Sequence, residues 1–129
     1  MCSSDLHPNG KWLVTNPSNS PENPPKGPGY KYFYDEVTGF YYFTTIVYGS
    51  SMDMQILKDL FGYYALASQI LKRDSNFAEK VLKARARLVP PQIGKDGTLQ
   101  EWTEDYEQLE DKHRHFSHMY GLYPGNVIS

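Results

Sequence analysis

The sequence predicts a mainly α chain in which a helical hairpin is accompanied by short β-hairpins and long loops. Apolar residues recur at steps of three and four between residues 50 and 73, and again between 76 and 88, which is the spacing of helices with one buried face. An aromatic and β-branched stretch over 31–49 favours paired strands. Five prolines from Pro17 to Pro28 exclude a helix or a central strand, so a long loop is expected there.

The first helix is expected to run from Ser50 or Ser51 to Lys72-Arg73. Ser51 can cap its N-terminus, and Asp53 in the first turn suits the positive end of the helix dipole. The basic pair at the other end suits the negative end of the dipole.

The second helix is expected from about Asn76 to Leu88. Asn76 and Glu79 fit a capping box, and Pro90-Pro91 stops the helix. Because only a few residues separate the two helices, they are expected to pack as an antiparallel hairpin.

Turn signals predict the smaller elements. Val37-Thr38-Gly39 is the expected turn of the aromatic hairpin, and Asp96-Gly97 that of a short hairpin over 92–100. The acidic stretch 101–111 is expected to be a loop with a helical turn, and 113–123 a short helix that ends at Pro124-Gly125.

The composition limits the classes of function. The 129 residues suffice for one compact domain. A net charge of −2 gives no electrostatic reason to expect nucleic acid as a partner, and no apolar run approaches the ~20 residues that a membrane-spanning helix needs, so no membrane insertion is expected. Cys2 is the single cysteine, which excludes an internal disulfide. The 15% aromatic content suits sugar stacking as well as an ordinary core.

The first candidate site is Glu22, in the stretch NPSNSPEN over 16–23. A carboxyl group in a proline-stiffened, amide-rich loop can be oriented for general-acid chemistry. The alternative is an exposed linker with a solvated glutamate.

The second candidate is Glu101-Trp102, directly after the short hairpin. A Trp beside a carboxylate can stack on a sugar face while the carboxylate accepts hydrogen bonds from hydroxyls. The alternative is a half-buried Trp with polar neighbours.

The third candidate is the stretch HRHFSH over 113–118. His115 and His118 share a face if the segment is helical, but no HExxH motif and no acidic ligand at a matching step supports zinc. Arg114 with His115 suits a polyhydroxyl ligand or a carboxylate, and a solvated polar turn is the alternative.

Taken in order, these stretches resemble six signature blocks of the glycoside hydrolase family 95 α-L-fucosidases. The blocks are WLVTNPSNSPEN (12–23), SMDMQI (51–56), ARARL (84–88), QIG (92–94), LQEW (99–102) and HRHFSH (113–118) followed by GLYPG (121–125). The resemblance covers residues 12–129 and leaves an N-terminal segment, 1–11, unplaced.

The resemblance implies a slice of an (α/α)6 barrel, incomplete at both ends, whose loops build a sugar pocket. Such enzymes release terminal α-linked L-fucose, α1,2-linked in the expected substrate, from fucosylated glycans with inversion at the anomeric carbon. By similarity Glu22 is the general acid, and Arg114 and His115 bind the sugar. We add the following expected pocket residues: Trp102, Glu101, Asp53 and His118.

The match also has departures from the family. The family's water-activating Asn-x-Asn pair lies upstream of the Glu22 block and its supporting Asp lies downstream of 113–118, and neither has a counterpart here. The isolated chain is therefore expected to be inactive. A carbohydrate-binding remnant that does not hydrolyse, an α-L-galactosidase of the same family and an all-α interaction module remain as alternatives.

Acid–base hydrolysis by a positioned water requires neither a metal nor another cofactor, so none is expected. The localisation stays open, because a signal peptide of a secreted or periplasmic parent would precede this segment.

Overall fold

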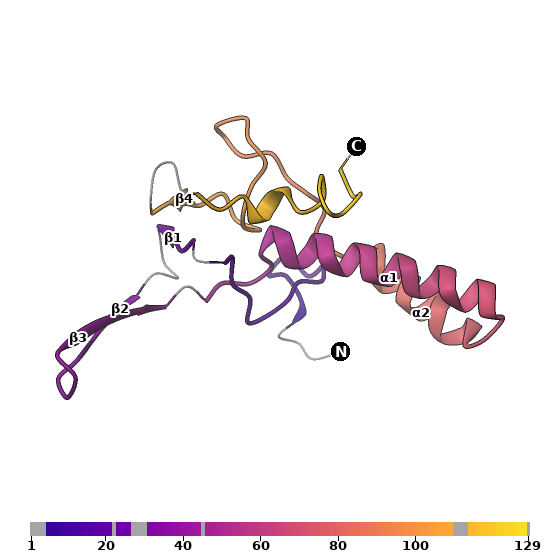
Figure 1. The fold of residues 1–129 in the computed structure, drawn as a ribbon, viewed down its shortest axis with the longest axis horizontal. Coiled ribbons are helices and arrows are strands. Elements are labelled where there is room, and N and C mark those ends of the chain that lie inside the picture. Colours follow the sequence, from indigo (N-terminus) through magenta and orange to yellow (C-terminus); the bar gives the residue numbers. More distant parts are fainter. Residues whose placement is uncertain (1–4, 22, 27–30, 45, 110–113, 129) are drawn as a thin grey trace.

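The computed structural model describes residues 5–21, 23–26, 31–44, 46–109 and 114–128. Its elements are, in chain order, β1 (Pro25–Lys26), β2 (Lys31–Asp35), β3 (Phe40–Thr44), α1 (Ser51–Leu71), α2 (Ser75–Arg85), β4 (Glu107–Gln108) and the 3-10 helix η2 (Ser117–Met119). The two α-helices are the longest elements, so the prediction of a mainly α chain with one helical hairpin is confirmed. Figure 1 shows this hairpin and the β2–β3 hairpin projecting in opposite directions from a centre made of loops.

Helix α1 begins and ends as predicted, but its cap is one residue earlier than expected. The side chain of Ser50 accepts a hydrogen bond from the amide of Asp53 at 3.3 Å. Ser51 instead lies inside the first turn, where its hydroxyl accepts a hydrogen bond from Gln55. The helix ends at Leu71, and Lys72 follows in the left-handed region with φ 53°.

The capping box predicted for the second helix is wrong. Asp74 is the N-cap residue, and its side chain makes no capping hydrogen bond. The helix also ends at Arg85 rather than Leu88, because the next residues leave it to pair with the segment near the N-terminus. The amide of Leu13 donates to the carbonyl of Arg87 at 2.7 Å, and Leu13 and Leu88 form a parallel bridge.

The apolar core lies at the base of the helical hairpin. It consists of five buried side chains: Leu13, Val14, Met54, Leu88 and Val89. Away from this base α1 packs only on α2 among the described elements, for example through Tyr64 and Phe77, whose rings meet edge to face at 5.4 Å. Large apolar side chains of the hairpin are therefore exposed: Leu60, Tyr63, Leu66, Ile70, Leu71, Phe77 and Leu82.

The hairpin β2–β3 is confirmed, with an antiparallel register from Lys31 opposite Thr44 to Asp35 opposite Phe40. The amide of Gly39 closes its turn on Asp35, and Gly39 has a φ of 70°, which favours glycine. The predicted short hairpin is present as an antiparallel bridge between Ile93 and Leu99.

The sequence did not indicate the pairing of β1 with β4, in which Pro25 lies opposite Gln108. This pairing makes part of 101–111 extended, and no helical turn is found in the described residues 101–109. The longer helix predicted over 113–123 is wrong for the described residues 114–123, where only the 3-10 turn η2 forms before the turns that lead to Pro124. Among the described residues, no helix has both the length and the apolar character needed to cross a bilayer.

Candidate functional site

The loop that precedes residue 22 is fastened to the first turn of α1. The carboxylate of Asp53 accepts hydrogen bonds from the hydroxyls of Ser18 at 2.6 Å and Thr15 at 3.0 Å. The Ser18 hydroxyl also accepts a hydrogen bond from the amide of Ser50 at 2.9 Å, and its backbone pairs with Val47. Asp53 is thus bonded to protein hydroxyls, and a contact with sugar, predicted from the sequence, stays a prediction.

The segment around η2 is fastened to the same end of α1 by Gln55, whose side chain is almost completely buried. Its amide nitrogen donates to the hydroxyl of Ser51 and to the carbonyl of His118, both at 2.7 Å. Its amide oxygen accepts a hydrogen bond from the backbone of Gly121. The first two turns of α1 therefore carry both the loop before residue 22 and the segment 117–121.

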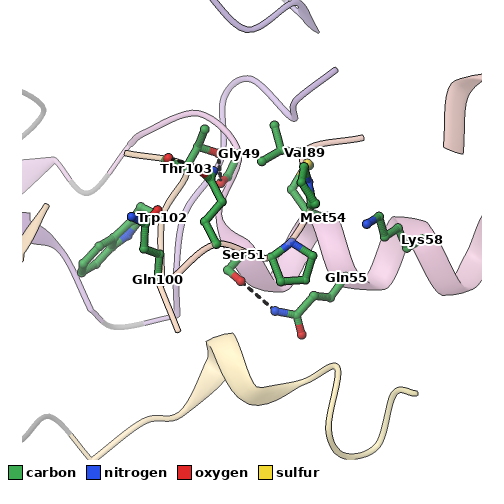
Figure 2. Close-up of a pocket in the computed structure, with 12 residues that line it drawn as sticks. Gly49, Ser51, Met54, Gln55, Lys58, Val89, Gln100, Trp102 and Thr103 are labelled. Atoms are coloured by element: carbon green, nitrogen blue, oxygen red, sulfur yellow. Dashed lines mark hydrogen bonds between the residues drawn. The ribbon is translucent and has the colours of Figure 1, made fainter. Parts of the chain in front are cut away.

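Closely packed side chains leave only a small gap beside Gln55. Figure 2 shows Met54, Val89 and Thr103 around this gap, with the hydrogen bond from Gln55 to Ser51. Its volume is about 10 Å³, which is room for one water at most. A sugar therefore does not fit in this space.

Glu101 is the point at which the three sequence clusters meet. One carboxylate oxygen, Oε1, accepts hydrogen bonds from the hydroxyls of Ser20 and Ser117, the latter at 3.0 Å. The other oxygen, Oε2, accepts a hydrogen bond from the side-chain amide of Asn23 at 2.5 Å. The hydroxyls of Ser20 and Ser117 also lie 2.8 Å apart. The loop around residue 22 and the segment after residue 113 are thereby held on one carboxylate.

The surroundings of this carboxylate favour its ionised form in spite of its burial. Burial on its own raises the pKa of Glu101, but the interaction with His118 and the hydrogen bonds from Ser20 and Ser117 outweigh it and hold the pKa below its ordinary value. Nδ1 of His118 lies 3.6 Å from Oε2 of Glu101, so the two side chains form an ion pair when the imidazole is protonated. Glu101 is 4% exposed, and both its oxygens are occupied by protein donors.

Residue 22 itself lies outside the described residues, and the prediction for Glu22 stays a prediction. Its surroundings are described on both sides. Ser20 and Asn23 are each 1% exposed, and the amide of Asn23 donates to the carbonyl of Ser20 at 3.3 Å, which closes a turn. Pro21, which follows Ser20, is exposed. The two ends of the turn are therefore buried, whereas Pro21 faces outward.

An open cavity of about 460 Å³ lies next to Pro21. Arg114 and His115 line it, together with Phe116 and Tyr120. A cation, an imidazole and aromatic faces around one cavity are groups that can bind a polyhydroxyl ring. Arg114 and His115, the predicted sugar-binding residues, therefore line one cavity together with Pro21. Pro21 directly precedes the predicted acid, Glu22, in the sequence.

A second open cavity of about 750 Å³ adjoins the first, and His115 lines both. Glu101, Trp102 and His118 line this second cavity. Trp102 is 3% exposed, more deeply buried than either reading of the sequence required, and its ring meets that of Tyr106 at 6.3 Å. Stacking of Trp102 on a sugar therefore stays a prediction.

The described residues hold no group of three or more His, Cys, Asp or Glu side chains placed to bind a metal ion. Of the histidine cluster, residue 113 lies outside the described part of the chain. His115 faces the two cavities, while His118 turns toward Glu101.

The sequence analysis did not single out four residues that build the site: Ser20, Asn23, Gln55 and Ser117. Ser20, Asn23 and Ser117 donate hydrogen bonds to the buried carboxylate of Glu101, and the buried side chain of Gln55 bonds to the backbone of His118 and Gly121. Gln55 follows the core residue Met54 in the sequence and is buried with it in the first turns of α1. The partners of Glu101 lie up to 81 residues away along the chain, so no local pattern indicates them.

The family model and two relatives agree on one family of proteins. The model of the glycosyl hydrolase family 95 catalytic domain matches residues 3–129. The chain is 40% identical over 119 residues, 92% of its length, to "Alpha-L-fucosidase 2" of Arabidopsis thaliana, and 29% identical over 91% of its length to "Probable alpha-fucosidase A" of Aspergillus niger. It spans 13% of the length of each of these relatives. Because the family model covers nearly the whole chain, the chain belongs to the glycosyl hydrolase family 95 catalytic domain family.

Proposed function

We propose that this chain is the part of an inverting α-L-fucosidase that carries the general acid and part of the sugar site. In this proposal the enzyme removes terminal L-fucose, α1,2-linked, from glycans. The observation that carries the proposal is the convergence on Glu101. It joins the turn around residue 22 to the segment that lines a cavity with Arg114 and His115. The names of two relatives, "Alpha-L-fucosidase 2" and "Probable alpha-fucosidase A", support fucose as the sugar that is released.

Glu22 is the proton donor in this proposal. Cleavage of a fucosyl bond needs a proton on the leaving oxygen, and inversion needs a water activated on the opposite face of the sugar ring. Glu22 supplies the first of these, from a turn whose flanking residues are fixed. The residues that activate the water come from outside these 129 residues.

Arg114 and His115 bind the fucose hydroxyls in the cavity next to Pro21. A guanidinium donates several hydrogen bonds in a fixed plane, which suits neighbouring hydroxyls on a ring. The methyl group at C6 of L-fucose favours an apolar wall, and Met52 and Phe116 line the same cavity. Trp102 and His118 are proposed for the neighbouring cavity, where the rest of the glycan would lie.

We also assign the α1–α2 hairpin to one of the six hairpins of an (α/α)6 barrel. The support is the row of exposed apolar side chains on both helices, which include Leu60, Ile70 and Phe77. Helices of the rest of the domain would cover these side chains.

The test uses the protein encoded by the complete reading frame that contains this chain. Incubated with an α1,2-fucosylated lactose, it should release L-fucose, and proton NMR of the first product should show the β anomer, because inversion converts the α linkage to β. The α anomer as first product would contradict inversion. Faster release of L-galactose from the matched galactoside would identify an α-L-galactosidase, and saturable binding of fucose without release would identify a binding protein.

A further inference from the structure

The burial of Glu101 leaves it poorly placed to touch a sugar and well placed to act on the residues that do. Its side chain is 2% exposed. Three side-chain donors already occupy its two oxygens, from Ser20, Asn23 and Ser117. A fucose hydroxyl would have to displace one of these buried donors to reach it.

The hydrogen-bond partners of Glu101 come from two segments, residues 20–23 and residue 117. Ser20 and Asn23 lie on the two sides of residue 22, two positions before it and one after it. Ser117 lies two residues after His115 and binds the same oxygen as Ser20. One carboxylate therefore sets the distance between the turn around residue 22 and the wall of the sugar cavity.

We propose that Glu101 is a positioning residue for the acid step: it holds the turn that carries Glu22 at the correct place relative to a sugar bound by Arg114 and His115. The inference rests on the function proposed above. Glu101 acts through Ser20, Asn23 and Ser117 and does not itself meet the substrate. We call the hydrogen bonds of Glu101 to these three residues the Glu101 clamp. A displacement of a proton donor by about 1 Å can cost on the order of 10²-fold in rate, so the loss of this clamp should lower kcat.

The hydrogen-bond polarity of the clamp gives a specific way to break it. Glu101→Gln keeps the size of the side chain but replaces one acceptor oxygen with an amide that donates. When this amide faces Asn23, two donors are opposed at a distance of 2.5 Å; when it is flipped toward Ser20 and Ser117, their hydroxyls lose the oxygen that accepts their hydrogen bonds. Combining Glu101→Gln with Asn23→Asp restores one donor and one acceptor across the pair with their roles exchanged.

The experiment measures kcat and KM of the protein from the complete reading frame on two fucosides. An α1,2-fucosylated lactose has a poor leaving group and needs the acid, whereas a 4-nitrophenyl α-L-fucoside leaves as a stabilised anion and needs it far less. Glu101→Gln is expected to lower kcat on the lactose by about 10- to 100-fold and on the aryl fucoside by less than about threefold, with similar KM values. The double variant should recover most of the loss.

Asp35→Asn is the matched control, because Asp35 is also a hydrogen-bonded carboxylate but lies at the end of β2, next to the turn of the β2–β3 hairpin. Its kcat should stay unchanged on both substrates. Ser20→Ala serves as a milder second variant if Glu101→Gln does not fold, since it removes one donor only, and the same preferential loss on the lactose is expected.

Three results would overturn the inference. Equal losses on both fucosides, with no recovery in the double variant, would mean that Glu101 only supports the fold. A raised KM with an unchanged kcat would mean that Glu101 contacts the sugar directly. An unchanged kcat and KM in Glu101→Gln would mean that the clamp does not matter. If the unmodified protein hydrolyses neither fucoside, the proposed function itself fails, which is a separate outcome.

Discussion

The hydroxyl of Ser18 donates a hydrogen bond to Asp53 at 2.6 Å, although the two residues are 35 positions apart. The same hydroxyl accepts a hydrogen bond from the amide of Ser50, next to the N-terminus of α1. This places a loop that precedes the candidate acid directly on the start of the longest helix. These hydrogen bonds hold the loop at Ser18, which has almost no regular structure, against the first turn of α1.

Replacing Asp53 should therefore destabilise the protein. Asp53→Ala leaves the hydroxyls of Thr15 and Ser18 without their shared acceptor and removes a favourable charge from the first turn of α1. The expected loss is about 1–3 kcal/mol in the free energy of unfolding, measured by urea denaturation. Glu79→Ala on the exposed side of α2 should change it by less than about 0.5 kcal/mol. Equal effects of the two substitutions would contradict this role of Asp53.

Gly121 and Gly62 should respond to alanine in opposite ways. A Cβ at Gly121 would lie 2.5 Å from the amide oxygen of Gln55, so Gly121→Ala should destabilise the protein by about 1–3 kcal/mol. A Cβ at Gly62, inside α1, would meet Arg85 at an ordinary 3.4 Å, so Gly62→Ala should stabilise the protein by up to about 1 kcal/mol through helix propensity. Thermal unfolding of both variants tests the pair. A Gly121→Ala variant as stable as the unmodified protein would show that Gln55 does not hold this segment.

The contribution of Glu101 to stability should depend on pH. Its pKa in the folded protein is lowered from the ordinary value of 4.5, so it binds its proton less readily when folded than when unfolded. Its stabilising effect is therefore complete above the unfolded pKa and is lost as the pH falls through the folded one. The difference in unfolding free energy between the unmodified protein and Glu101→Gln should therefore be larger above the ordinary pKa of 4.5 than below it, and should shrink as the pH falls further.

Glu107→Gln provides the control for this pH dependence. Glu107 is an exposed carboxylate whose partners, Lys26 and Lys95, lie at 3.6 and 3.7 Å. Exposed pairs of this kind contribute little, so its difference curve should stay near zero. A flat curve for Glu101→Gln as well would contradict a lowered pKa of Glu101 in the folded protein.

The isolated chain of 129 residues should not hydrolyse fucosides. Its hairpin exposes large apolar side chains such as Leu66 and Leu71, which gives the helices little packing of their own. The chain also spans 13% of the length of its relatives. We expect no release of fucose from an α1,2-fucosylated lactose by the purified chain, while the product of the complete reading frame is active. Release by the isolated chain that Glu22→Gln abolishes would contradict this prediction.

Local patterns predicted the helical hairpin and the β2–β3 hairpin, because their signals lie within a few neighbouring residues. They missed the pairing of β1 with β4, and they did not indicate that Leu13 would end the second helix early by pairing with Leu88. Such contacts join segments that are more than 70 positions apart, and only the packed structure determines them.

In the candidate site, too, residues within local motifs could be predicted from the sequence, whereas contacts between distant segments could not. The residues Glu22, Arg114 and His115 came from ordered blocks that resemble one family, and the structure brings Arg114 and His115 to one cavity beside Pro21. The buried state of Glu101 could not be inferred from the sequence, since an acidic residue beside a Trp suits a pocket and a core equally well. Its role depends on donors from two distant segments.

The central claim is that Glu22 protonates the leaving oxygen of a fucosyl bond. The most direct measurement is the kcat/KM of Glu22→Gln on an α1,2-fucosylated lactose, made in the protein from the complete reading frame, with Glu36→Gln in the exposed β2–β3 turn as the control. We expect Glu22→Gln to lose about 10²- to 10⁴-fold, through kcat, and the control to lose nothing. A Glu22→Gln variant that keeps its kcat/KM within a few-fold of the unmodified protein would contradict the account.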